Sequence, residues 1–141
     1  MYYLKTRESF DSAHFLAGYA GKCANIHGHR WTMEVEIEGE ELTLTGVKRD
    51  MLMDFGDLKK IVRALADSYD HKLIYEAGTL KPATVAALQE EGFQMVALPF
   101  RPTAENLAKH FYGLLQECGL DLHAVTVYET PENCAIYKEE T

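Results

Sequence analysis

The order of apolar patterns along the chain limits its fold more than any other feature. Residues 31–37 alternate strictly between apolar and polar side chains, which is the period of a half-buried β-strand. Residues 2–10 alternate less sharply but are rich in Tyr, Thr and Phe, and we expect them to pair with 31–37 across a long loop, 11–28. Strand character returns at 122–129 and at 134–138, on either side of a segment whose Pro and Asn favour a turn between antiparallel neighbours.

Two stretches between these strands have the spacing of amphipathic helices. The first covers 55–69 behind Asp54 as N-cap, and the second opens at Thr103 and stops at Gly119. Strands and helices are therefore segregated, which predicts an α+β domain with a four-stranded sheet and both helices on one face. Such a sheet has unpaired edges and an uncovered face, so we expect the chain to oligomerise.

The stretch between the two helices is less clearly patterned. Residues 82–91 can form a short helix that Gly92 ends, and 95–98 is a brief apolar run. We treat 76–100 as an insertion. With 141 residues and 47% hydrophobic content, the chain 1–141 is predicted to be one domain with its own core.

Charge and cysteine content exclude several classes of protein. The net charge of −8 repels phosphate backbones and anionic lipid, and no apolar run approaches the ~20 residues that cross a bilayer, so nucleic acid and membrane are not expected partners. Three scattered cysteines and the lack of a charged-then-apolar leader argue against an exported disulfide scaffold. We expect a cytoplasmic protein.

Three imidazoles and a thiol lie close together in the sequence, at His14, Cys23, His27 and His29. If His29 opens a strand, His27 and His29 project from the same face, and three imidazoles suit zinc. Three protein ligands leave the fourth position of the ion open, whereas Cys23 as fourth ligand would close it. The alternative is that these histidines only satisfy local hydrogen bonds. Cys23 itself can be a ligand, a buried small hydrophobe or, next to Lys22 in a glycine-containing loop, a reactive thiolate.

Three further side chains can carry chemistry. Asp70 and His71 follow the first helix, where they either complement the helix dipole or act as an oriented proton relay. Glu129 ends a strand, where it is either a surface carboxylate or an acceptor for the two parallel N–H bonds of a guanidine-like ligand edge. The five glutamates of 34–41 are interpreted as a solvated strand face and turn.

Six segments, taken in order, together resemble the 6-pyruvoyl-tetrahydropterin synthase and 6-carboxytetrahydropterin synthase family. They are Phe10-Asp-Ser-Ala-His14, Cys23-x-x-x-His27-Gly-His29, Asp54-Phe-x-x-Leu-Lys59, Asp70-His71, Pro102-Thr-Ala-Glu-Asn106 and Glu129-Thr-Pro-x-Asn133. The resemblance spans nearly the whole chain. It implies the tunnelling fold, a four-stranded antiparallel sheet with two helices whose copies assemble into a trimeric barrel, and two trimers stack into a homohexamer.

The same resemblance implies roles for the residues singled out above. His14, His27 and His29 become zinc ligands, Cys23 the proton acceptor, Asp70 and His71 its relay partners, and Glu129 the pterin anchor. It also implies that active sites lie between subunits. The chain departs from the family pattern after His71, where a Leu-Asn pair commonly follows and this chain reads Lys72-Leu-Ile-Tyr75.

The activity implied by the resemblance is a zinc-dependent lyase reaction in queuosine (7-deazaguanine) biosynthesis. It converts 7,8-dihydroneopterin triphosphate to 6-carboxytetrahydropterin with loss of acetaldehyde and triphosphate. Two alternatives stay open, a 6-pyruvoyl-tetrahydropterin synthase that only eliminates triphosphate and a non-catalytic zinc-stabilised binding protein. The sequence does not choose the residues that bind the triphosphate; Lys22, Arg30, Lys48, Arg49 and Lys72 are available.

Overall fold

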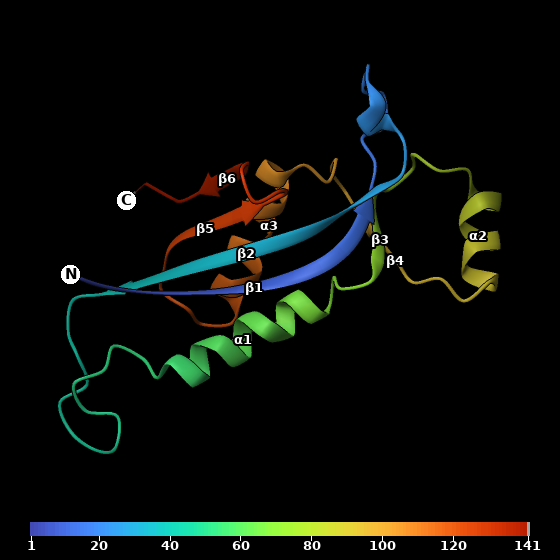
Figure 1. The fold of residues 1–141 in the computed structure, drawn as a ribbon. Helices are drawn as coiled ribbons and strands as arrows, with labels where there is room; N and C mark the ends of the chain where they lie inside the picture. The colour runs from blue at the N-terminus through green and yellow to red at the C-terminus, as the bar shows by residue number, and fades with distance from the viewer. Residues whose placement is uncertain (141) are drawn as a thin grey trace.

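Two long paired strands form the centre of the structure (Figure 1). The computed structural model describes residues 1–140. Its strands are β1 (Tyr2–His14), β2 (His27–Gly39), β3 (Lys72–Glu76), β4 (Met95–Leu98), β5 (Leu122–Tyr128) and β6 (Cys134–Tyr137). Its helices are α1 (Phe55–Asp67), α2 (Pro82–Glu90) and α3 (Ala104–Glu117).

β1 and β2 pair antiparallel along their full length, so the strands predicted at 2–10 and 31–37 are confirmed but longer than expected. The predicted loop shortens to 15–26, and His14 and His27 therefore belong to strands.

The sheet has six strands in the order β4-β3-β1-β2-β5-β6. β5 and β6 continue antiparallel beside β2, as predicted. On the other side, β3 lies parallel to β1 and β4 lies parallel to β3. The prediction of a four-stranded, purely antiparallel sheet is therefore wrong: the sheet is six-stranded, mixed and curled (Figure 1).

The additional strands come from the segment that was expected to be an insertion. β3 and β4 have only five and four residues, which is too short to show a strand period in the sequence. α2 provides the crossover that two parallel neighbours require, and it confirms the short helix predicted at 82–91. None of the residues of α2 is buried, and the helix stands away from the rest of the molecule (Figure 1).

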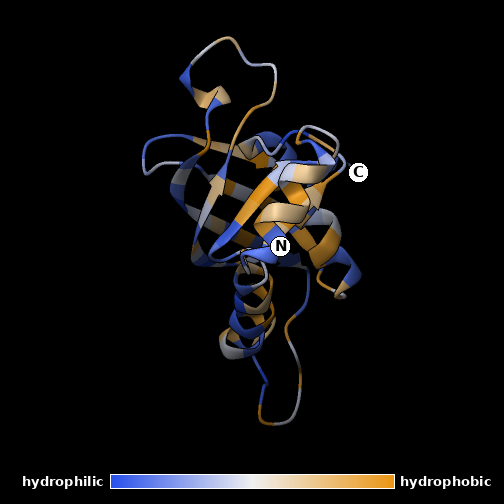
Figure 2. Ribbon diagram, turned by 90° about the vertical axis from the view of Figure 1, so that its right-hand side faces the viewer, coloured by the Kyte–Doolittle hydropathy of each residue, from blue (hydrophilic) through white to orange (hydrophobic). Residues whose placement is uncertain are grey.

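The two other helices begin where their caps predict. The Asp54 carboxylate accepts a bond from the Gly56 N–H at 2.7 Å, and the Thr103 hydroxyl accepts one from the Asn106 N–H at 3.1 Å. α1 and α3 both pack against one face of the sheet, as predicted, and apolar residues interleave with polar ones along the elements (Figure 2). Within residues 1–140, no helix combines the length and the hydropathy needed to cross a membrane.

The core between helices and sheet contains an aromatic cluster that reaches the end of β1. Phe111 of α3 is fully buried and meets Phe10 of β1 with ring centroids 6.1 Å apart and Tyr69 with centroids 5.0 Å apart. Phe10 in turn stacks on Trp31 of β2 at 6.2 Å. These contacts fix both helices relative to the end of the hairpin where the histidines lie.

We predict that Phe111→Ala lowers the free energy of unfolding by about 3–5 kcal/mol, because the substitution leaves a cavity in this cluster. Urea denaturation followed by circular dichroism measures the change. Phe93→Ala is the matched control, since Phe93 is 61% exposed and should change stability by less than about 0.5 kcal/mol. Equal losses in the two variants would contradict this account of the core.

Candidate metal centre and active site

Three imidazoles converge at one end of the β1–β2 hairpin. His14 lies directly opposite His27, and His29 is two residues further along β2. Because side chains alternate along a strand, all three project from the face that carries α1 and α3. The ring centroid of His14 is 4.6 Å from that of His27 and 5.1 Å from that of His29, and the latter two are 4.9 Å apart. The strand register thus assembles the histidines that the sequence singled out.

Backbone carbonyls set the tautomer of two of these rings. The Nδ1 of His14 lies 2.8 Å from the carbonyl oxygen of Pro102, and the Nδ1 of His27 lies 2.7 Å from that of Asn25. A carbonyl only accepts, so Nδ1 carries the proton and Nε2 carries the lone pair. The Nε2 atoms of His14, His27 and His29 are all buried and have no hydrogen-bond partner. Buried polar atoms are rarely left unpaired, and this outer support of the rings is typical of metal ligands.

Burial favours the neutral form of two of these rings. It is the main reason why the pKa of His14 falls to about 4; the bond to Pro102 acts in the opposite direction, and the neighbouring imidazoles add to the lowering. Burial also lowers the pKa of His29, although the Glu129 carboxylate works in the opposite direction. Neutral imidazole is the form that binds a metal ion.

Glu129 lies beside the three imidazoles, at the end of β5. Its Oε1 is 3.0 Å from the Nε2 of His29, although their geometry is not that of a hydrogen bond. One ligand atom from each of the four side chains lies within 4.8 Å of all the others. Three nitrogens and one carboxylate oxygen fit a tetrahedral zinc site. Glu129 can therefore reach either a metal ion or a molecule bound next to one.

Cys23 lies on the 3-10 turn at 22–24, in the loop that joins His14 to His27. It is half-buried and unbonded to another cysteine. Its sulfur lies outside the group of candidate ligand atoms formed by His14, His27, His29 and Glu129. In this structure the fourth donor next to the imidazoles is Glu129.

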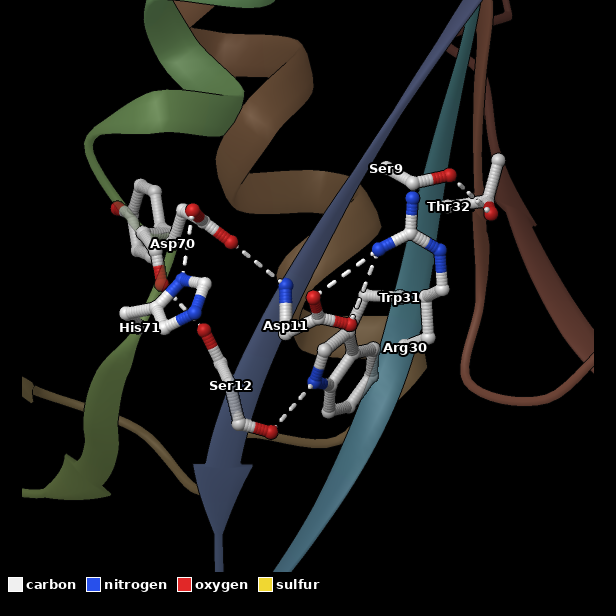
Figure 3. A network of polar contacts seen from close by, with 9 residues as sticks. Ser9, Asp11, Ser12, Arg30, Trp31, Thr32, Asp70 and His71 are labelled. Atoms are coloured by element: carbon white, nitrogen blue, oxygen red, sulfur yellow. Dashed lines mark hydrogen bonds and ion pairs between the residues drawn. The ribbon is translucent and has the colours of Figure 1, made fainter.

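Asp70 and His71 form a second constellation, held by the backbone of β1 (Figure 3). One Asp70 oxygen accepts the Asp11 N–H at 2.8 Å, and the other lies 2.8 Å from the Nδ1 of His71. The N–H of His71 donates to the Asp11 carbonyl at 2.6 Å, and the buried Ser12 hydroxyl donates to the carbonyl of Tyr69. His71 adopts a left-handed backbone conformation, with φ of 57°, which is rare for a residue with a side chain. The pair is thus rigidly oriented.

The bond from Asp11 and the bond from His71 lower the pKa of Asp70, and the charge of Arg30 contributes less. Asp70 is therefore a carboxylate at neutral pH. Because it holds Nδ1 of His71, the Nε2 of that exposed ring remains for chemistry. Nothing in the sequence around Asp11 or Ser12 signalled this support, since it comes from the backbone of a distant strand.

The imidazole group and the Asp70–His71 pair lie on different sides of the hairpin. His71 lines a hollow with Asp11, Ala13 and Arg30, whose side chains alternate onto the uncovered face of the sheet, and Ser12 and His29 of the intervening positions also border it. The three imidazoles alternate onto the opposite face. One chain therefore brings the histidines together and orients the pair, but it presents the two constellations in different directions.

The sequence missed a buried ion pair on the uncovered face. Glu34 is only 6% exposed, so its interpretation as part of a solvated strand face is wrong. It receives bonds from Nε of Arg7 at 3.0 Å and from Nη2 of the same guanidinium, and it lies 3.2 Å from Nζ of Lys5. Arg7 also lies over the ring of Tyr128, at 5.5 Å. Because Arg7 and Glu34 are directly opposite in the β1–β2 register, the pairing of residues 2–10 with 31–37 in the correct register would have revealed the contact.

The chain is similar to proteins of one family over nearly its whole length. The family model described as 6-pyruvoyl tetrahydropterin synthase matches residues 3–140. A 6-carboxy-5,6,7,8-tetrahydropterin synthase of Haemophilus influenzae is 37% identical over 142 residues, covering 99% of this chain and 100% of the relative. A protein of the same name from Aquifex aeolicus is 34% identical over 129 residues, covering 84% of this chain and 77% of the relative.

Two solved structures share the fold. An uncharacterised protein from Wolinella succinogenes superposes with a TM-score of 0.81 at 20% identity, covering 99% of this chain and 98% of that one. The 6-pyruvoyl tetrahydropterin synthase of Caenorhabditis elegans gives a TM-score of 0.69 at 24% identity, covering 99% and 96%. At these identities the likeness concerns the fold alone.

We predict that Glu34→Gln destabilises the protein in a pH-dependent way. Burial works to raise the pKa of Glu34, but the bonds from Arg7 and Lys5 outweigh it and leave the pKa below the ordinary 4.5. The stabilisation is therefore present above that ordinary value and is lost as the pH falls through the lowered pKa. We expect a loss of about 1–2 kcal/mol in unfolding free energy near neutral pH that shrinks in acid, measured by urea denaturation across pH.

Glu36→Gln provides the control, because Glu36 lies further from Lys5, at 3.8 Å, and its side chain is 23% exposed. A Glu34→Gln effect that stays constant from neutral to acid pH would contradict the assignment.

Proposed function

Since this chain belongs to the 6-pyruvoyl tetrahydropterin synthase family, we propose that it is a zinc-dependent 6-carboxy-5,6,7,8-tetrahydropterin synthase. The reaction converts 7,8-dihydroneopterin triphosphate and water to 6-carboxytetrahydropterin, acetaldehyde and triphosphate. The observation that carries the proposal is the convergence of three buried, unpaired Nε2 atoms in a chain that matches a relative of that name end to end. The physiological role proposed is a step of queuosine biosynthesis in the cytoplasm.

His14, His27 and His29 would hold the zinc ion, because their three Nε2 atoms lie close together without hydrogen-bond partners and backbone carbonyls accept the Nδ1 protons of His14 and His27. When bound there, zinc supplies Lewis-acid polarisation of the substrate's side-chain hydroxyls, which acidifies the neighbouring C–H bonds. The carbonyl of Pro102 and that of Asn25 keep two of the rings aimed at one point. In the proposal, the side chain of the bound pterin lies against the imidazole group.

The remaining residues manage protons and position. In the proposal, Sγ of Cys23 takes a carbon-bound proton, for which its position in a loop outside the ligand group leaves it free. Nε2 of His71 gives and receives the proton on the other side of the substrate, while Asp70 holds its Nδ1. Glu129 accepts the N–H bonds of the pterin ring, which it can do from beside His29. The ring and its side chain exchange oxidation level internally, so no redox cofactor is needed.

We further propose that a complete site forms between two copies of the chain. The three imidazoles project from the helix-covered face of the hairpin, while His71 lines a hollow with residues of the other face, which supports a site completed by a second copy. The terminal strands of the sheet, β4 and β6, have free edges through which copies can pair into a barrel. The proposed assembly is a homohexamer built from two trimers.

Product analysis tests the activity directly. We predict that zinc-loaded protein incubated with 7,8-dihydroneopterin triphosphate releases acetaldehyde in equal amount to 6-carboxytetrahydropterin, measured by a coupled alcohol dehydrogenase assay and by mass spectrometry. A 6-pyruvoyl product without acetaldehyde would identify the chain as a 6-pyruvoyl-tetrahydropterin synthase instead. Absence of any turnover with zinc bound would support a zinc-stabilised binding protein.

Mixing of two inactive variants tests the roles and the shared site together. We predict that Cys23→Ala and His71→Asn each reduce kcat by at least about 100-fold, because each lacks one proton-transfer group, while zinc content stays at one ion per chain. Asn is chosen for position 71 because it tolerates the left-handed backbone there. Co-expression of the two variants should restore activity at about a quarter of the interfaces, where two intact groups meet.

Zinc content and unfolding midpoint separate this model from a structural one. Loss of zinc and stability in Cys23→Ala would show that the sulfur is a ligand. An absence of restored activity in co-expressed hexamers would show that both groups act within one chain.

A further inference from the structure

The five basic residues available to bind an anionic tail are not equivalent in the structure. Lys48 is paired with Asp57 of α1, Arg49 follows it in the same exposed loop, and Lys22 lies on the 3-10 turn. By contrast, Arg30 and Lys72 both line the hollow that contains His71. This hollow has a volume of about 520 Å³ and lies over the point where Ala13 of β1 faces Gly28 of β2.

Gly28 lies at the bottom of this hollow, and the fold does not require a glycine at this position. A Cβ built on Gly28 would meet only the carbonyl oxygen of Ser12, at an ordinary 3.8 Å, and the backbone of Gly28 is not left-handed. Neither packing nor backbone geometry therefore explains the glycine. Its lack of a side chain leaves room above the strand pair, in the hollow that Arg30, His71 and Lys72 also line.

Arg30 is held in place at the edge of this space (Figure 3). Its Nη1 donates to both carboxylate oxygens of Asp11, at 3.2 and 3.0 Å. These bonds use one nitrogen of the guanidinium, so Nε and Nη2 remain as donors for a ligand. The charge of Arg30 also reaches Asp70, whose pKa it helps to lower. Lys72 forms no ion pair with any residue from 1 to 140, and its ammonium is free to bind an anion.

One carboxylate lines the hollow, and a donor already occupies it: Asp11 accepts two bonds from Arg30. The nearby Asp70 accepts from the Asp11 N–H and lies against Nδ1 of His71. Nε and Nη2 of Arg30 and the ammonium of Lys72 form no bond with these carboxylates. An anion that enters the hollow therefore meets two cations next to His71, although the chain as a whole has a net charge of −8.

We propose that Arg30 and Lys72, next to His71, bind the polyphosphate ester of the substrate; this rests on the proposed function. In the reaction, the C–O bond to the polyphosphate breaks and its electron pair leaves with the terminal oxygen, while a proton is lost from carbon. The two cations counter the charge that accumulates on the departing oxygen, and Nε2 of His71 lies where it can protonate that oxygen. They act as binding residues that select a polyphosphate over a free hydroxyl.

The test compares the affinity for two ligands that differ only in the polyphosphate. Zinc-loaded Cys23→Ala protein, which binds without turnover, is titrated with 7,8-dihydroneopterin triphosphate and with 7,8-dihydroneopterin, followed by the fluorescence of the dihydropterin. We predict that the triphosphate binds more tightly by at least about 100-fold, and that adding Arg30→Gln or Lys72→Gln reduces this preference by about tenfold each. Affinity for 7,8-dihydroneopterin itself should not change.

Lys109→Gln is the matched control, because it removes the same charge from an exposed position on α3. If the preference for the triphosphate over 7,8-dihydroneopterin is unchanged in both test variants, Arg30 and Lys72 do not bind the polyphosphate, even though the pterin binds. Failure of both ligands to bind the parent protein would instead overturn the proposed function, and the subsite with it. Should Arg30→Gln lose zinc or fold poorly, Lys72→Gln, which removes a charge without an ion pair, decides the matter.

Discussion

The register between β1 and β2 is the constraint on which the rest of the structure depends. Thirteen residue pairs run from Tyr2 opposite Gly39 to His14 opposite His27, and a slip by one residue would turn every side chain of one strand to the other face. The same register buries Trp31 under the helices, sets Arg7 opposite Glu34 and brings three imidazoles together. The core around Trp31, the Arg7–Glu34 ion pair and the candidate metal centre therefore all follow from the β1–β2 register. Each of them in turn favours that register over a shifted one.

The sequence was sufficient to predict the features that depend on local patterns and on motifs. The alternation of 31–37 predicted β2, the caps at Asp54 and Thr103 predicted two helix starts, and the spacing of His27 and His29 predicted a shared face. It did not reach β3 and β4, which are too short to show a period and are defined by their parallel neighbours. It also did not reach the carbonyl of Pro102 behind His14 or the N–H of Asp11 on Asp70, because the backbone groups of any residue look alike in a sequence. The roles of Cys23, Asp70, His71 and Glu129 stay predictions.

The buried imidazoles and the Arg7–Glu34 ion pair lie on opposite faces of the hairpin. The face under the helices holds neutral imidazoles, since burial lowers the pKa of His14 and of His29. The other face holds fixed charges, with Glu34 bound to Arg7 and Asp11 bound to Arg30.

The bond between His14 and Pro102 links metal affinity to the docking of α3. Pro102 directly precedes the N-cap of that helix, 88 residues away from His14 along the chain. The hairpin by itself contains all three imidazoles, yet His14 acquires its tautomer only when the helix is seated. Binding of an ion by these imidazoles would therefore be thermodynamically coupled to the docking of α3: the ion would stabilise the docked helix, and a change that destabilises the docking would weaken ion binding by the same free energy.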